Sequence, residues 1–230
     1  MKNIVVVGGT KGIGKQIVEL LDDYNVFVLA RSIDELNNHV NKHFISFDAT
    51  QNSIDLSALP SVIDGIVYCP GTINLKPFHR LTAEDFYNDW KINFMGAVKV
   101  IQHLLPKLKM AALPSIVLFS TVAVGSGMPF HASIASAKGA VEGLTKSLAA
   151  ELAPKVRVNC IAPSLTNTSL AEKLVNTPEK IESGGKRHPL QRIGLPADIA
   201  EMACFLLSDK AGWITGQIFH IDGGMSTLKV

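Results

Sequence analysis

The sequence predicts a single-domain, doubly wound α/β fold with a mainly parallel sheet and helices on both faces. Short apolar runs alternate with longer segments in which apolar residues recur at helical spacing, the pattern of βαβ units with right-handed crossovers. Several of the short runs are apolar at consecutive positions, as strands covered on both faces are. A chain of 230 residues, 47% of them hydrophobic, can form one large core, so we expect one domain over residues 1–230.

The individual elements can be placed in order along the chain. The apolar runs that we interpret as strands are residues 4–7, 26–29, 66–68, 116–119 and 156–158. The segments of helical periodicity are residues 12–22, 83–110, 134–151 and 197–207, and the second should divide near Asn93. Residues 163–196 are rich in Ser, Thr, Gly and Pro, with one helical stretch near residues 170–175, so we expect a mobile substrate loop or lid there.

Composition narrows the classes of function. The formal net charge is only +2, and no block of Lys or Arg gathers on one segment, which argues against a nucleic-acid or membrane partner and for a small molecule. Cys69, Cys160 and Cys204 are far apart and odd in number, so we interpret them as buried small hydrophobes, and the histidines suggest no metal site. The apolar N-terminal run is too short for a signal peptide and no run reaches membrane-spanning length, so we expect the cytoplasm.

The first motif that carries chemistry is Val7-Gly8-Gly9-Thr10-Lys11-Gly12-Ile13-Gly14, between the first expected strand and the first expected helix. Gly8 allows a tight turn, Gly12 lets the backbone approach a pyrophosphate, and Gly14 lets the helix pack closely. The helix N-terminus would stabilise the phosphate charge. The motif therefore predicts a dinucleotide site, with a purely structural turn as the alternative.

The end of the second expected strand indicates which dinucleotide is bound. A fold that prefers NAD usually carries Asp or Glu there, which binds the ribose 2′-hydroxyl. This chain has Ala30-Arg31-Ser32, with no acid, and Arg31 and Lys11 could reach a 2′-phosphate. NADP(H) is therefore favoured over NAD(H), the alternative being that both cations are solvated surface charges.

Further motifs extend over essentially the whole chain. They are Asp48-Ala49, Lys91-Ile92-Asn93-Phe94-Met95-Gly96, Asn159-Cys160-Ile161-Ala162-Pro163-Ser164, the run over residues 189–200, and Thr215-Gly216-Gln217 followed by Asp222-Gly223-Gly224. Together with the glycine-rich turn they resemble the short-chain dehydrogenase/reductase family, and most closely its 3-oxoacyl-[acyl carrier protein] reductase type, although Ser164 replaces a glycine. The resemblance implies a Rossmann-type fold with a seven-stranded sheet.

The resemblance also implies which residues contact the cofactor. Asp48 and Ala49 take the position next to adenine, Asn93 the kink of a helix, and Thr168 the nicotinamide end. The implied set is Gly8, Thr10, Lys11, Gly12, Ile13, Gly14, Arg31, Ser32, Asp48, Ala49, Gly71, Asn93, Lys138, Ile161 and Thr168.

Two departures from the family pattern matter. Where the family has NNAG after the fourth strand, this chain has Tyr68-Cys69-Pro70-Gly71, so only the glycine is kept. In the catalytic YxxxK motif Lys138 is present, but the position four residues earlier is Ile134, so the catalytic tyrosine is missing. The chain's three tyrosines, Tyr24, Tyr68 and Tyr87, fall in other elements.

The resemblance assigns roles to the residues that are kept. In the family, hydride passes to a carbonyl carbon while the tyrosine protonates the oxygen, the lysine binds the nicotinamide ribose, and Ser or Thr orients the carbonyl. Asn93, Thr121 and Lys138 are the catalytic positions retained here. Ser120, beside Thr121, is a second hydroxyl that could bind a substrate oxygen, with a strand-end cap as its alternative.

Ile134 cannot transfer a proton, so another donor is needed. His131 lies seven positions before Lys138 and would share its side of the helix if the chain there is already helical. An ordinary surface or structural histidine is the alternative interpretation. Ser133 is most simply the N-cap of the following helix.

Two functions of different classes follow. The first is an NADP(H)-dependent oxidoreductase that reduces a carbonyl or, by similarity to enoyl reductases, an activated C=C bond; its proton donor is His131, a Ser or Thr hydroxyl, or a water ordered by Asn93 and Lys138. The second is a non-catalytic NADP(H)-binding protein that acts as a sensor, partner subunit or scaffold. The retention of Asn93, Thr121 and Lys138 favours the first.

Neither the substrate nor the assembly can be derived from local patterns. The loops over residues 72–81, 126–131 and 163–196 carry no charged cluster that would indicate a phosphate or polyacid ligand. The resemblance implies a homotetramer or homodimer through the helices of residues 93–110 and 134–151, whose small residues suit close packing. Packing of those residues on the protein's own sheet is the alternative.

Overall fold

The computed structural model describes residues 1–33, 41–51 and 55–229, and within them seven parallel strands form one sheet in the order β3-β2-β1-β4-β5-β6-β7. The chain order reverses between β1 and β4, which confirms the doubly wound topology. The strands are β1 (Asn3–Val7), β2 (Asn25–Ala30), β3 (Lys42–Ser46), β4 (Gly65–Tyr68), β5 (Ser115–Phe119), β6 (Arg157–Pro163) and β7 (Ile218–Ile221).

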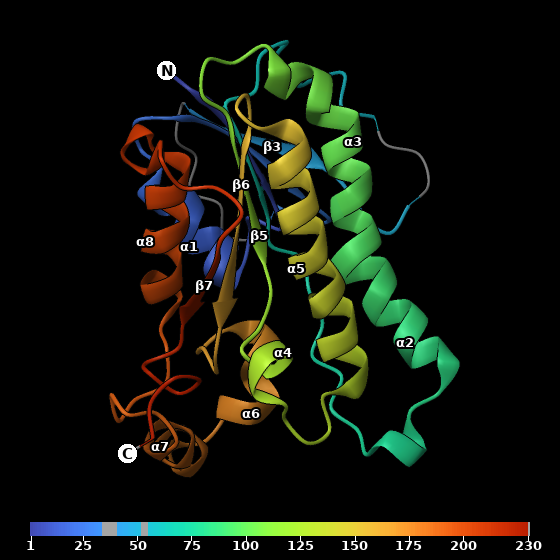
Figure 1. The fold of residues 1–230 in the computed structure, drawn as a ribbon, viewed down its shortest axis with the longest axis vertical. Helices are drawn as coiled ribbons and strands as arrows, with labels where there is room; N and C mark the ends of the chain where they lie inside the picture. The colour runs from blue at the N-terminus through green and yellow to red at the C-terminus, as the bar shows by residue number, and fades with distance from the viewer. Residues whose placement is uncertain (34–40, 52–54, 230) are drawn as a thin grey trace.

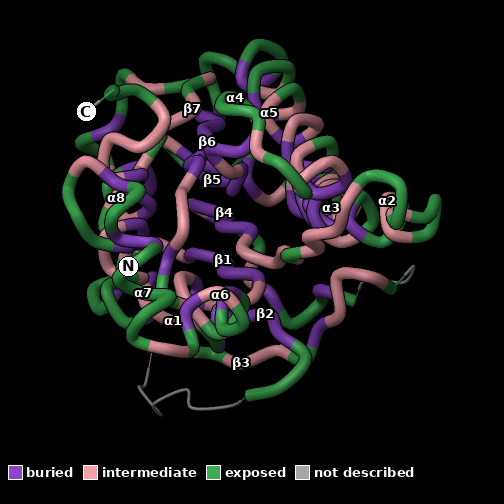
Figure 2. Tube along the Cα trace, turned by 90° about the horizontal axis from the view of Figure 1, so that it is seen from below, coloured by how far each residue is buried: buried purple, intermediate pink, exposed green. Residues whose placement is uncertain are grey.

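Helices cover both faces of the sheet (Figure 1). On one face lie α1 (Gly12–Leu20) and α8 (Pro196–Leu207), and on the other lie α3 (Gly96–Lys109) and α5 (Ala132–Leu152). The five inner strands, β2, β1, β4, β5 and β6, are mostly buried, whereas the edge strands β3 and β7 consist of intermediate and exposed residues (Figure 2). No helix in the described part of the chain combines the length and the apolar character needed to cross a membrane.

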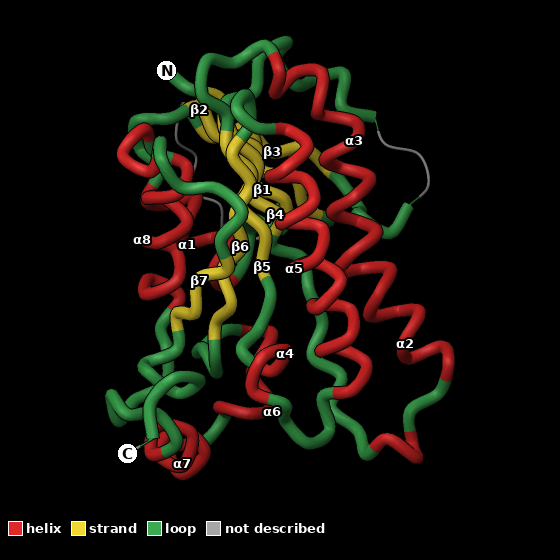
Figure 3. Tube along the Cα trace, viewed as in Figure 1, coloured by secondary structure: helices red, strands yellow, loops and turns green. Residues whose placement is uncertain are grey.

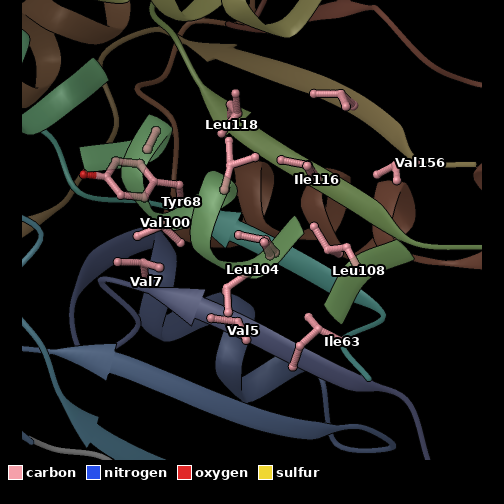
Figure 4. Packing of buried hydrophobic residues seen from close by; sticks show 14 of the residues in the cluster. Val5, Val7, Ile63, Tyr68, Val100, Leu104, Leu108, Ile116, Leu118 and Val156 are labelled. Atoms are coloured by element: carbon pink, nitrogen blue, oxygen red, sulfur yellow. The ribbon is translucent and has the colours of Figure 1, made fainter. Parts of the chain in front are cut away.

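Alternate residues of each strand point to opposite faces, so the sheet separates two hydrophobic clusters. Val5 and Val7 pack with Val100 and Leu104 of α3 (Figure 4), whereas Ile4 and Val6 pack on the α1 and α8 side. This two-sided burial explains why the strands are apolar at consecutive positions. The expectation of buried cysteines is met fully by Cys160, while Cys69 and Cys204 are only half-buried.

The long helical segment divides at Asn93, as predicted. The helix α2 (Ala83–Trp90) passes into a π-helical turn (Lys91–Met95), and α3 follows directly. The side-chain amide of Asn93 donates to the carbonyl oxygen of Asp89 at 2.7 Å, which lies one turn earlier. A side chain that bonds into the helix ladder in this way is a common cause of a local change of helix geometry.

The segment over residues 163–196 contains more helix than the sequence predicted (Figure 3). It holds a 3-10 turn (Ser169–Ala171), α6 (Glu172–Val175) and α7 (Pro178–Lys186). The start of α7 carries clear signals, because the Thr177 hydroxyl caps the helix and Pro178 occupies its first turn. The helix α7 was not predicted because the Gly184-Gly185 pair suggests a loop. The short helix α4 (Ala123–Ser126) was also missed.

Candidate active site

The carboxyl ends of the strands open into a cavity of about 600 Å³. Its wall comes from the glycine-rich turn, the ends of β4 and β5, α5 and the segment over residues 163–188. In a doubly wound sheet, ligands bind outside the carboxyl ends of the strands, where the strand order reverses. The sequence-predicted site residues that line this cavity are Ile13, Gly71, Thr121, His131, Lys138 and Thr168.

The glycine-rich turn has the geometry that its sequence predicts. Gly8 and Gly12 have φ angles of 75° and 53°, in the left-handed region that favours glycine. A Cβ on Gly14 would lie 2.2 Å from the carbonyl oxygen of Gly8, so only glycine lets α1 begin this close to the turn. The N-terminus of α1 therefore faces the strand ends, where its first N–H groups can bind an anion.

A second cavity adjoins the same turn. Thr10, Lys11 and Gly12 line it, together with Thr168, which also lines the first cavity. The γ-methyl and Cβ of Thr168 would lie 3.4 Å from a Cβ on Gly12, so this side chain covers the turn closely. Thr168 thus borders both cavities, and an extended ligand could run past it from one to the other.

The predicted adenosine end lies further along the same edge of the sheet, outside both cavities. Arg31 and Ser32 follow β2 and are exposed, and Asp48 and Ala49 follow β3, whose Ser46 pairs with Ala30. The Asp48 carboxylate accepts hydrogen bonds of 2.8 Å from the backbone and the hydroxyl of Thr50. These bonds lower the pKa of Asp48, and the charge of Arg31 adds to the effect.

Asn93 is buried in the middle of the π-helical turn. Its amide nitrogen donates to Asp89 O and, at 2.8 Å, to the Thr72 hydroxyl, which in turn donates to the Asp89 carboxylate at 2.5 Å. The Oδ1 atom of Asn93 has no partner among the described residues and lies 3.2 Å from where a Cβ on Gly71 would be. A buried acceptor without a partner is costly, so this atom is a candidate for binding a ligand or water at the cavity.

Lys138 is almost fully buried on α5, with 8% of its surface exposed. Its ammonium group donates to the carbonyl oxygen of Phe119 at 2.9 Å, which aims it at the end of β5. Burial lowers the pKa of Lys138 to about 8, partly offset by the nearby Cys160, Cys69 and Asp89. Burial of this ammonium group costs desolvation free energy, and groups perturbed in this way are often found at functional sites.

The two hydroxyls after β5 differ in what they can do. The Ser120 hydroxyl donates to the Glu142 carboxylate at 2.6 Å, so its proton is already used within the protein. The Thr121 oxygen accepts from the backbone N–H of Ala123 at 3.3 Å, and its hydroxyl donates to no acceptor among the described residues, so its proton can go to a substrate oxygen. Thr121 is therefore the better candidate to orient a carbonyl group.

Ile134 and Lys138 lie one turn apart on α5, and both line the cavity. His131 also lines it, and its Nδ1 lies 2.7 Å from the carbonyl oxygen of Pro129. The expectation that Ser133 caps α5 is wrong: His131 occupies the N-cap position, and the buried Ser133 hydroxyl has no partner in the described structure.

The predicted cofactor-binding residue Ile161 lies on β6. Its side chain is completely buried between the sheet and the helices α1 and α8, and it lines neither cavity. Its carbonyl oxygen accepts a hydrogen bond from the Ser120 N–H at 2.8 Å, which joins β6 to the chain after β5.

Two features of the cavity were missed from sequence. Ser164 and His188, distant in the chain, are joined by a hydrogen bond of 2.7 Å on the cavity wall. The helices α6 and α7, with the residue that follows α7, also bring charged side chains to the cavity, although no cluster was apparent in the sequence: Lys173, Glu179, Lys180 and Arg187. Helical folding of the segment places these residues together, and the periodicity of α7 was the signal available.

The chain is similar in sequence and in structure to known reductases and dehydrogenases. The family model described as enoyl-(acyl carrier protein) reductase matches residues 8–226. The 3-oxoacyl-[acyl-carrier-protein] reductase of Thermotoga maritima is 31% identical over 97% of this chain and 97% of its own length. A short chain dehydrogenase family protein from Francisella tularensis superposes with a TM-score of 0.90 at 30% identity, over 99% of this chain and 100% of that one. ElxO with NADP bound has a TM-score of 0.86 at 28% identity, over 99% of each chain.

Proposed function

The chain belongs to the short-chain dehydrogenase/reductase family and is a short-chain oxidoreductase, and we propose that it uses NADP(H) to reduce a carbonyl or activated C=C bond with His131 as proton donor. One observation carries this proposal. Lys138, Thr121 and His131, which come from three separate positions in the sequence, line a single cavity beside the glycine-rich turn.

The residues around the turn fit a dinucleotide. The positive φ angles of Gly8 and Gly12 and the close approach of Gly14 leave room for a pyrophosphate at the N-terminus of α1. Asp48 and Ala49 would hold the adenine, and Thr168, Asn93 and Lys138 the nicotinamide half. When bound, the cofactor supplies the hydride.

Preference for NADP(H) is supported by charge. Arg31 is exposed directly after β2, and Lys11 lies on the adjacent turn, so both cations are at the edge of the sheet where a 2′-phosphate would be. The similarity to ElxO with NADP bound supports the same preference.

The other side chains at the cavity would bind the cofactor and orient the substrate. As a buried cation, Lys138 would hold a ribose hydroxyl and, with the unpartnered Oδ1 of Asn93, keep the cofactor in place. The Thr121 hydroxyl would donate to the substrate oxygen and orient the carbonyl.

His131 is the group that can move a proton. Its Nδ1–H is held by the Pro129 carbonyl, which can only accept, so the Nε2 side of the ring is left for the substrate. In the doubly protonated ring, Nε2 would donate a proton to the product oxygen or carbon. Ile134 leaves this space apolar and does not compete for the proton.

The segment over residues 163–196 would act as a lid over this cavity. Its helices α6 and α7 already form one wall, so a small displacement would admit substrate and its return would exclude water.

The proposal is tested by NADPH oxidation with quinones, 3-oxoacyl thioesters and enoyl thioesters. We expect His131→Ala to lower kcat on the order of 10²-fold, the usual contribution of a general acid. The matched control is His103→Ala, an exposed histidine on α3, which should match the native chain. Native activity in His131→Ala would show that the proton comes from elsewhere.

A further inference from the structure

The cavity wall carries a hydrogen-bonded pair, Ser164 and His188, that has no role in the proposed reduction. The Oγ atom of Ser164 lies 2.7 Å from Nε2 of His188, and Nδ1 of His188 lies 2.8 Å from the carbonyl oxygen of Gly184. Both side chains line the cavity, although His188 is only 2% exposed. A histidine that bonds at both ring nitrogens is held in one orientation.

The contacts of His188 determine where the hydrogens lie. A carbonyl oxygen can only accept, so Nδ1 carries the ring hydrogen. In the neutral ring Nε2 is then an acceptor, and the Ser164 hydroxyl must donate to it. The lone pairs of Ser164 Oγ are left to accept hydrogen bonds from the cavity.

The pair lies next to the expected position of the reacting group. The Ser120 N–H donates to Ile161 O at 2.8 Å, and the Val122 N–H donates to Pro163 O at 3.2 Å. The chain after β5 therefore runs beside the end of β6, which places Thr121 and Ser164 at neighbouring strand ends. A substrate whose carbonyl is bound by Thr121 would pass Ser164 within a short distance.

The surroundings hold the pair rigidly. A Cβ on Gly184 would lie 2.9 Å from a methyl group of Leu165, so the end of α7 packs this closely on the chain after β6 only because this residue is glycine. On its other side, His188 adjoins the turn at Gly223, which accepts a hydrogen bond from Leu190 at 3.2 Å. The acceptor is therefore preorganised.

We propose that Ser164 and His188 form a subsite for a hydroxyl group of the substrate, so that the chain prefers hydroxyketones to the corresponding alkyl ketones. The inference rests on the proposed function, since it names the substrate class for the same cavity. An alkyl group at Ser164 would displace water and leave the acceptor unpaired, whereas a substrate hydroxyl would donate to it.

The kinetic test uses two ketones that differ by one group. In 4-hydroxy-2-butanone a hydroxyl replaces the terminal methyl of 2-pentanone. The measured quantity is the kcat/KM for 4-hydroxy-2-butanone divided by the kcat/KM for 2-pentanone, both with NADPH. We expect Ser164→Ala to lower this ratio about 3- to 10-fold relative to the native chain. Comparing ratios between variants cancels the intrinsic reactivity of the two ketones.

The control is Ser136→Ala, an exposed serine on α5 whose hydroxyl donates to Ala132 O. It should leave the ratio unchanged. A second pair, 1-hydroxy-2-butanone and 3-pentanone, places the hydroxyl one carbon closer to the carbonyl. Equal ratios in Ser164→Ala and the native chain for both pairs would overturn the subsite.

A binding readout separates this inference from the reduction itself. In protein labelled with ¹⁵N at the imidazole rings, the His188 signals are assigned by their loss in His188→Gln. We expect 4-hydroxy-2-butanone, and not 2-pentanone, to shift the Nε2 signal, and Ser164→Ala to abolish the shift. If the native chain reduces neither these ketones nor any quinone, 3-oxoacyl or enoyl thioester of the panel, the proposed function fails while this shift still supports the subsite. An equal response to both ketones overturns the subsite.

Discussion

The hydroxyl of Tyr68 lies where a side chain on residue 96 would be: a Cβ added to Gly96 would be 2.0 Å from it. This hydroxyl donates to the carbonyl oxygen of Ile92 at 2.6 Å, within the π-helical turn that carries Asn93. Tyr68 is the last residue of β4, so its contact ties the end of this strand to the π-helical turn that carries Asn93. The absence of a side chain at Gly96 makes this tie possible.

Gly96→Ala should therefore destabilise the fold by about 2–3 kcal/mol, because the added methyl overpacks a buried contact. Tyr68→Phe in the same chain should recover part of the loss, since it removes the oxygen that the methyl meets. Urea denaturation of the four chains in this cycle measures the coupling. Gly143→Ala, which meets no atom within 4 Å, is the control, and additive losses at Gly96 and Tyr68 would contradict the account.

The buried ammonium of Lys138 should make stability depend on pH. Its pKa is about 8 in the folded chain and about 10.5 when exposed, so between these values the unfolded chain binds a proton that the folded chain lacks. The free energy of unfolding, relative to Lys138→Met, should rise by about 1 kcal/mol per pH unit over this window. Denaturation at pH 7, 8, 9 and 10 checks this, and a constant difference would show that the group is not desolvated.

Cofactor choice should depend on Arg31. Arg31→Ala is expected to weaken NADPH binding about tenfold, because a charge-assisted contact with the 2′-phosphate is lost, and to leave NADH binding unchanged. Fluorescence titration measures both affinities. Arg80→Ala, an exposed arginine that lines neither cavity, should behave as the native chain. Equal weakening of both cofactors by Arg31→Ala would assign this residue to another part of the dinucleotide.

A tyrosine at position 134 should add a proton donor to the cavity. Ile134 shares the cavity with Lys138 one turn away, so Ile134→Tyr would bring a phenol next to the ammonium group that lowers its pKa. We expect carbonyl reduction to increase on the order of 10²-fold. Ile134→Phe has the same ring without the hydroxyl and should show no gain. A similar gain in both variants would trace the effect to ring packing.

Much of this site could be predicted because its determinants are local in sequence. The consecutive apolar residues of β1 and the glycines that follow it need only their own neighbours to specify a strand and a turn. Asn93 was placed at a helix break for the same reason, since its side chain bonds one turn back.

The parts that sequence reasoning missed depend on contacts between distant segments. Ser164 and His188 meet because the end of α7 packs on the chain that follows β6, and the glycine pair that suggests a loop is what allows this close packing. Ser133 was misplaced because α5 starts earlier than its hydrophobic pattern, with His131 as N-cap. Asp89 is buried beside Asn93, and its place in the site could have been predicted only if the π-helical turn were known.

The most direct test of the central claim is transfer of deuterium from NADPH labelled at C4 of the nicotinamide to a product, measured by mass spectrometry with the quinone, 3-oxoacyl and enoyl thioester panel. The account predicts labelled product with the native chain and its loss in both His131→Ala and Lys138→Ala. NADPH binding without label transfer in the native chain, together with transfer in Ile134→Tyr, would contradict it and show a cofactor-binding protein that has lost its acid.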